Sequence, residues 1–165
     1  MKLRGFGKGL FQGSLILLIT INIFNALNYV FHFVMARMLT AADYGILVTL
    51  MSVLYIFNIS TESIQTIISK FASKEQNPGK IKNLLKRSTN KSIKLAFNLF
   101  LVFLVLSVFL SRFLRIDYGL LALSGIIIFS VFILPINRGI LQGVKKFNAL
   151  GYNMVLEAIF KLLMA

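Results

Sequence analysis

The sequence has no cysteine, no tryptophan, two prolines, one histidine and only five acidic residues among its 165 residues. Without cysteine it can form neither a disulfide nor a thiolate metal site. His32 has too few carboxylates around it to build a metal site and makes a Ser-His-Asp set implausible. A glycine-rich phosphate loop ending in Lys-Ser/Thr is missing too. We therefore predict no metal, no cofactor and no enzymatic activity.

What the chain has in excess is apolar side chain. Hydrophobic residues make up 58% of it, the mean hydropathy is +0.83 and only 14% of residues are charged. A soluble domain of this size has too little interior to hide so much apolar surface. The apolar residues also come in long blocks, which indicates that lipid is the solvent. The lipid bilayer is thus the expected partner.

The apolar blocks predict an all-α fold, a polytopic membrane helix bundle with about five transmembrane helices. Each block approaches or exceeds the ~20 residues that a helix needs to cross the hydrocarbon layer. The predicted spans cover residues 10–38, 44–69, 95–114, 118–137 and 147–165.

Charge is one-sided, with 18 Lys and Arg against 5 Asp and Glu and a net charge of +13. In a soluble protein this excess would suggest nucleic acid, but here the cations lie between the apolar blocks, so we expect no nucleic-acid partner. Fourteen cations fall in the segments before span one, after span two and after span four, and three fall on the opposite side. The positive-inside rule then predicts a multi-pass protein of the cytoplasmic membrane with a cytoplasmic N-terminus.

Residues 70–94, between spans two and three, are polar and basic. Ile81, Leu84 and Leu85 share one helical face, and Lys82 occupies another. This pattern predicts an amphipathic helix on the inner leaflet. It serves either as a topological anchor or as a contact for lipid headgroups or a substrate pyrophosphate.

Polar residues inside apolar spans are costly and therefore informative. Asn22, Asn25, Asn28 and His32 fall on one stripe of the first span. The stripe should face protein or a water-filled cavity. It either joins helices through hydrogen bonds or forms a cavity wall.

Glu157 lies about ten residues into the fifth span, and Lys161 follows one helical turn later. This order favours an intrahelical ion pair, and an ion pair at that depth is a candidate functional site. Pro135, near the end of span four, predicts a kink there. Arg138-Gly139-Ile140-Leu141-Gln142-Gly143 then predicts either a tight turn or a hinge.

Two segments resemble motifs of the polysaccharide-export flippases, within the multidrug/oligosaccharidyl-lipid/polysaccharide superfamily. Ala36-Arg37-Met38-Leu39-Thr40-Ala41-Ala42-Asp43-Tyr44-Gly45 resembles their A-R-x-L-G-P-x-x-Y-G turn. The stretch from Arg138 to Gly143, with Phe147, Glu157 and Lys161, resembles their R-G-x-L-Q-G-x-x-x-F with a later E-x-x-x-R/K. Thr40-Ala41 replaces the usual Gly-Pro, which predicts a less rigid turn.

The resemblance implies that residues 1–165 are part of the N-terminal lobe of a two-lobed flippase, which moves isoprenoid-linked oligosaccharide across the cytoplasmic membrane by alternating access. The partner is then a missing C-terminal lobe or a second chain, and the chain a fragment, a truncated or split product, or half of an assembly. In such a site cations meet the pyrophosphate, and the candidates for substrate binding here are Arg37, Arg138 and Lys161, with Glu157 orienting Lys161.

Two other functions stay open from the sequence. One is a cation-coupled drug exporter of the same superfamily, which the scarcity of acidic residues disfavours because coupling needs membrane carboxylates. The other is a small membrane subunit that does not itself transport.

Overall fold

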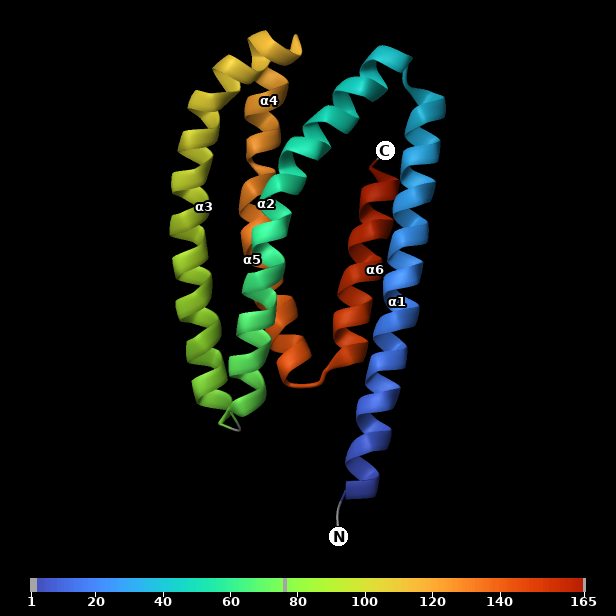
Figure 1. Ribbon diagram of the computed structural model, residues 1–165, viewed down its shortest axis with the longest axis vertical. Coiled ribbons are helices and arrows are strands. Elements are labelled where there is room, and N and C mark those ends of the chain that lie inside the picture. Colours follow the sequence, from blue (N-terminus) through green and yellow to red (C-terminus); the bar gives the residue numbers. More distant parts are fainter. Residues whose placement is uncertain (1–2, 76, 165) are drawn as a thin grey trace. The chain divides into compact units, whose positions relative to one another are not determined.

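The computed structural model describes residues 3–75 and 77–164, and the side chains of residues 11–59, 61–75 and 77–164. Throughout these residues the structure is helical, with no strand. The six helices are α1 (Leu3–Met38), α2 (Ala41–Lys74), α3 (Pro78–Leu114), α4 (Tyr118–Gly125), α5 (Ile127–Gly143) and α6 (Phe147–Leu163) (Figure 1). A helix satisfies its own backbone hydrogen bonds, which a chain in hydrocarbon must do. The predicted all-α class is confirmed.

Within the described residues, four helical stretches are long and apolar enough to cross a membrane: Phe11–Met38, Ala41–Lys74, Pro78–Leu114 and Tyr118–Gly143. The chain is therefore a multi-pass membrane protein. The fifth predicted span corresponds to α6, whose 17 residues measure about 26 Å at 1.5 Å per residue.

The basic segment at 70–94 does not form a helix of its own ahead of the predicted span at 95–114. Residues 78–94 are helical, but they are the first half of α3, which runs unbroken for 37 residues. Asn77 caps its start by accepting a hydrogen bond from the Gly79 N–H at 2.9 Å. No glycine or proline follows Gly79 before Leu114, so the change from polar to apolar side chains does not interrupt the backbone.

A kink at Pro135 stays a prediction, and the interruption that the fourth span does show lies elsewhere. Helix α5 continues through Pro135, and the break in the fourth span lies at Ile126, between α4 and α5. Gly125, just before the break, packs against α3 so closely that a Cβ there would lie 2.8 Å from Phe103 Cδ1. The irregularity thus accompanies a close helix contact rather than the missing proline N–H.

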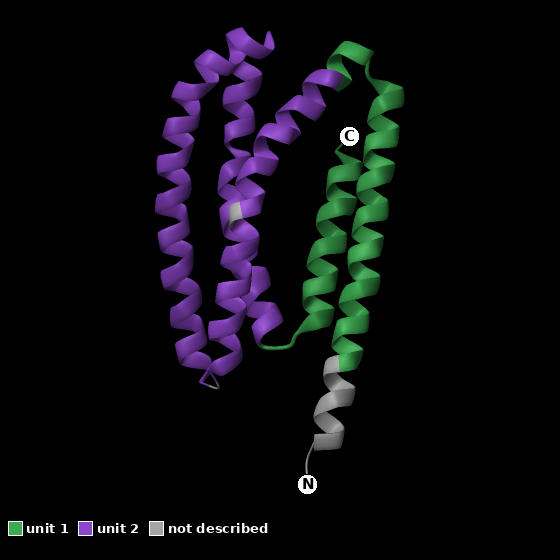
Figure 2. Ribbon diagram, viewed as in Figure 1, with its two compact units in different colours: residues 1–44, 144–165 green, residues 45–143 purple. Residues whose placement is uncertain are grey.

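The chain divides into two compact units, each described by itself (Figure 2). Unit 1 comprises residues 1–44 and 144–165, and here α1 and α6 lie side by side with their N-terminal ends together. Gly13 of α1 contacts the Phe147 ring, and a Cβ on Gly151 of α6 would lie 2.7 Å from Thr20 Oγ1. Small residues allow this close approach, which is how helices associate where no hydrophobic effect drives them.

Unit 2 comprises residues 45–143 and contains most of α2 with α3, α4 and α5. Its core is apolar, and Phe57 meets Phe103 edge to face with ring centroids 6.3 Å apart. The buried core residues are Leu54, Ala96, Phe103, Ile116, Leu121, Ile128, Val131 and Phe132. Ser107, buried on α3, donates to the Leu104 carbonyl of its own helix at 2.7 Å, and among the described residues no buried side-chain polar atom lacks a hydrogen-bond partner.

Candidate functional site

Lys161 is a charge in unit 1 that is held by side chains of another helix. Its half-buried side chain reaches from α6 to α1, where Nζ donates to Asn28 Oδ1 at 2.9 Å. The same ammonium lies 4.2 Å from the centroid of the Phe31 ring, within the range of a cation–π contact. Asn28 and Phe31 are three residues apart and so share a face of α1. The ammonium is therefore fixed by two side chains of a neighbouring helix.

Two further groups orient this contact. Asn28 Nδ2 donates to the Phe24 carbonyl at 2.9 Å, which turns the amide oxygen toward Lys161. Glu157, one turn before Lys161 on α6, acts on the ammonium by its negative charge. Asn28 is ten residues before the end of the Phe11–Met38 span, so the cluster lies about 15 Å inside it. A cation held at that depth marks a candidate functional site.

The other residues of the predicted stripe do not join this cluster. Asn22 Nδ2 donates to the Leu18 carbonyl of its own helix at 2.8 Å, and Asn25 is exposed. His32 Nδ1 lies 3.3 Å from the Tyr44 hydroxyl. Asn28 thus bonds to α6 and His32 to Tyr44 at the start of α2, and a cavity wall formed by all four stays a prediction.

The two candidate arginines lie in different units. Arg37 packs over the Phe33 ring of its own helix, with Cζ 5.1 Å from the centroid. It is nine residues beyond Asn28, or about 13 Å along α1. Arg138 belongs to unit 2, where it is half-buried on α5. Unit 1 therefore brings Glu157 and Lys161 together but not Arg37.

The motif at residues 36–45 forms the connection from α1 to α2, and Thr40 organises it. The Thr40 hydroxyl accepts from the Asp43 N–H at 3.2 Å and donates to the Asp43 carboxylate at 2.6 Å. This places Thr40 as the N-cap of α2 and Asp43 at the third helical position, with the N-cap hydroxyl satisfying the N–H of that position. These hydrogen bonds tie Thr40 to the first turn of α2, and the expectation that Thr40-Ala41 gives a less rigid turn than Gly-Pro stays a prediction.

The motif at residues 138–143 is not a turn, because all six residues belong to α5, and a hinge there stays a prediction. A Cβ on Gly139 would lie 2.7 Å from the Gln65 carbonyl oxygen, and one on Gly143 would lie 2.6 Å from the Ser69 carbonyl oxygen. Between them Gln142 accepts a hydrogen bond from Gln65 Nε2 at 3.1 Å. The motif thus packs α5 against the backbone of α2. The spacing Gly-x-x-x-Gly in an apolar helix is a sequence signal for this contact.

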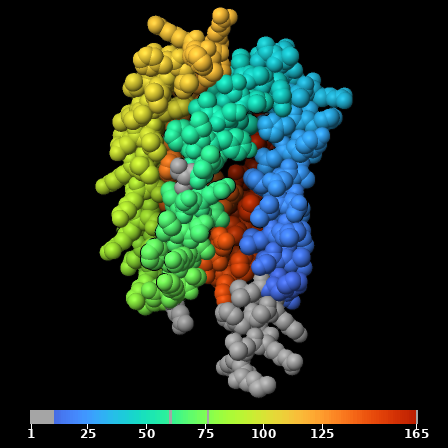
Figure 3. Space-filling view, in the orientation of Figure 1, coloured from blue at the N-terminus to red at the C-terminus, as the bar shows by residue number. Residues whose placement is uncertain are grey.

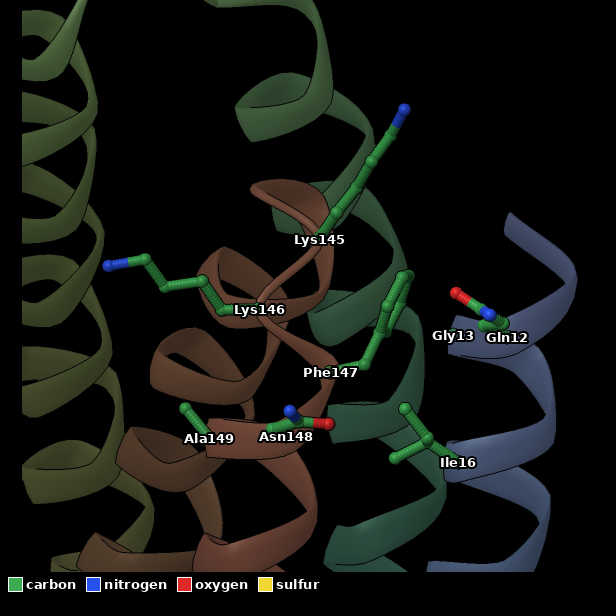
Figure 4. A pocket seen from close by; sticks show the side chains of 8 residues that line it. All are labelled: Gln12, Gly13, Ile16, Lys145, Lys146, Phe147, Asn148 and Ala149. Carbon is green, nitrogen blue, oxygen red and sulfur yellow. The ribbon is translucent and has the colours of Figure 1, made fainter. Parts of the chain in front are cut away.

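Unit 1 also has a shallow hollow that the sequence did not predict. Its volume is about 400 Å³, and it opens where α1 passes the start of α6 (Figure 4). The Phe147 ring closes one side against Gly13, and the side chains of Lys145 and Lys146 point away from each other (Figure 4). The lining residues are Gln12, Gly13, Ile16, Lys145, Lys146, Phe147, Asn148 and Ala149.

The family is shown by comparison with known proteins. The family model described as "Polysaccharide biosynthesis protein" matches residues 10–165, which includes all four spans, both motifs and the Asn28–Lys161 contact. No curated protein and no solved structure matches the chain. The chain belongs to the polysaccharide biosynthesis protein family.

Proposed function

We propose that this chain is part of a flippase that moves lipid-linked oligosaccharide precursors across the cytoplasmic membrane. Its family and its membrane-spanning helices support a transporter-like role. The observation that carries the proposal further is Lys161, an ammonium held inside the span by Asn28 and Phe31. A charged side chain at that depth in a membrane is costly, so its presence indicates a functional role.

The chemistry of the cluster suits a pyrophosphate. An ammonium has three N–H donors, and Asn28 Oδ1 accepts one of them. The others are suited to phosphate oxygens, whose charge the cation would offset in a medium of low dielectric constant. Glu157, one turn before Lys161 on α6, has the role of orienting the ammonium while no substrate is bound. Arg37 and Arg138 are further candidates for the same anion in another conformation of the transporter.

Transport by alternating access requires two bodies that move about a shared site. We propose that a C-terminal lobe or a second chain supplies the second body. The excess of cations on one side supports a cytoplasmic N-terminus, so that the connections after α2 and after α5 face the cytoplasm. The substrate would then enter from the leaflet where its pyrophosphate is made.

The test is flipping of a fluorescent isoprenoid-pyrophosphate saccharide in proteoliposomes that contain the native protein. Lys161→Met should lower the rate about tenfold, because a hydrogen bond to a charged group contributes roughly 1.5–3 kcal/mol. Lys161→Arg should retain most of the activity, and Lys70→Met, an exposed lysine at the end of α2, should retain all of it. Unchanged flipping by Lys161→Met would remove the basis of the proposal.

A further inference from the structure

The first half of α3 presents four cations on one face. At 100° per residue, Lys80, Arg87, Lys91 and Lys94 fall within an arc of about 60°. All four are exposed, whereas Ser92 on the opposite side is buried in unit 2. We call these four residues the cationic stripe. In the space-filling view, side chains of this part of α3 extend outward at the left edge (Figure 3).

The same face changes character farther along the helix. Leu101 and Val105 continue the line of the stripe, and both are exposed at 46% and 65%. Exposed apolar side chains on a membrane span face lipid. The stripe therefore begins where the lipid-facing surface ends.

The unbroken helix determines how far the stripe extends from the membrane. Residues 95–114 measure about 30 Å, which matches the hydrocarbon core, and each headgroup layer adds about 5–8 Å. With residues 95–114 as the hydrocarbon span, as the sequence predicts, Lys91 and Lys94 come at headgroup depth. Arg87 is about 10 Å and Lys80 about 21 Å beyond Lys94 along the axis, and a tilt of about 20° shortens these distances by less than a tenth. Half of the stripe thus lies outside the reach of lipid headgroups.

Little in the chain neutralises these charges. Glu75 is the one acidic residue between Lys70 and Lys94, and it pairs with Lys80 at 3.5 Å. Arg87, Lys91 and Lys94 form no ion pair with any described residue. The Glu75–Lys80 pair and the Asn77 cap close the connection between α2 and α3, so the stripe is presented on an ordered helix.

We propose that the cationic stripe is a docking surface for an acidic segment of another protein, which the proposed topology places in the cytoplasm. Cations at fixed positions over about 21 Å of helix match carboxylates repeated along a partner helix of similar length. Such a contact brings a cytoplasmic protein to the transporter at the membrane surface. A membrane-surface role fits less well, because it requires all four cations at one depth.

The experiment measures binding of a labelled helical acidic peptide of about four turns to the protein in nanodiscs of neutral lipid. Nanodiscs expose both membrane faces, so the result depends on neither orientation nor transport. Arg87→Gln with Lys91→Gln should weaken binding about three- to tenfold, since each exposed ion pair contributes roughly 0.2–1 kcal/mol. Lys82→Gln with Lys86→Gln removes the same charge from another face and should weaken it less than about twofold. Equal losses in the two pairs would overturn the proposal.

A second measurement separates the docking surface from a membrane-bound helix. The chain has no cysteine, so Lys80→Cys and Lys94→Cys each give a single site for a fluorescent label. In liposomes of anionic lipid, an aqueous quencher should reach the label at 80 far better than the label at 94. Equal quenching at the two positions would mean that the segment lies flat on the membrane, and the docking proposal would be wrong.

Discussion

Lys161 shows how a single residue depends on its surroundings in a span. Its ammonium is tolerable there because Asn28 Oδ1 accepts a hydrogen bond at 2.9 Å and Phe31 offers the face of its ring. Removing the acceptor leaves a charge with less compensation, which costs more than the hydrogen bond itself contributes. The energetic importance of Asn28 therefore exceeds that of Asn22, whose amide bonds only to its own helix.

We expect Asn28→Ala to lower the free energy of unfolding by about 1–3 kcal/mol. Asn22→Ala is the matched control, and its loss should stay below about 1 kcal/mol, because its bond lies within one helix. Unfolding in detergent, followed by circular dichroism, gives both values. A double-mutant cycle with Lys161→Met should show coupling between positions 28 and 161, and purely additive losses would argue against the contact.

Thr40 offers a second prediction at this scale. Its hydroxyl satisfies the Asp43 N–H at the start of α2, so Thr40→Ala should destabilise the protein by about 1 kcal/mol. Thr49 is the control, since its hydroxyl donates to the Gly45 carbonyl inside the helix, where that oxygen already accepts a backbone hydrogen bond. The same unfolding assay should show a smaller change for Thr49→Ala. A larger change at Thr49 would mean that Thr40 does not cap α2.

At the scale of helices, some glycines lie against a neighbouring helix, where a larger side chain would clash, and others face open space. A Cβ on Gly139 would meet the Gln65 carbonyl oxygen at 2.7 Å, and a backbone atom cannot move aside as a side chain can. Around Gly45 nothing lies within 4 Å of such a Cβ. Both residues are helical, so the intrinsic gain from replacing glycine by alanine is the same.

Gly139→Ala should therefore destabilise the protein by about 1–3 kcal/mol, because α5 must shift away from α2. Gly45→Ala should be neutral or stabilise it by up to about 1 kcal/mol. Denaturant unfolding of the two variants decides the matter. Equal effects at the two positions would show that α5 does not pack closely on α2.

The sequence predicted the helices better than it predicted where they join. Apolar blocks identify four spans because hydrocarbon admits only backbones that satisfy themselves. The continuity of α3 was missed because hydropathy changes at Leu95 while nothing there breaks the helix.

The residues of the candidate site could be predicted from the sequence, but their contact could not. Asn28, Glu157 and Lys161 are conspicuous as polar residues in apolar spans, but the contact of Lys161 with Asn28 depends on the packing of two helices 133 positions apart.

At the scale of the whole molecule, the arrangement of the charges gives a prediction about sidedness. Fourteen cations lie in segments on one side of the predicted spans and three on the other, and the inner leaflet retains basic segments. Asp117, the exposed N-cap of α4, lies on the cation-poor side, and Lys80, in the first turn of α3, lies on the cation-rich side. Because the chain has no cysteine, each position can carry the only thiol.

We expect Asp117→Cys to react with a membrane-impermeant maleimide added to intact cells, and Lys80→Cys to react only after the membrane is opened. Replacing Asp117 removes its hydrogen bonds from Gly119 N and Leu120 N, at a cost of about 1 kcal/mol that a protein of this length should tolerate. Arg115→Cys, two residues away, is the control, because it leaves the hydrogen bonds of Asp117 in place. The reverse pattern would place the N-terminus outside and put the cationic stripe on the wrong side of the membrane for a cytoplasmic partner. Labelling of both positions in intact cells would show that α3 does not cross.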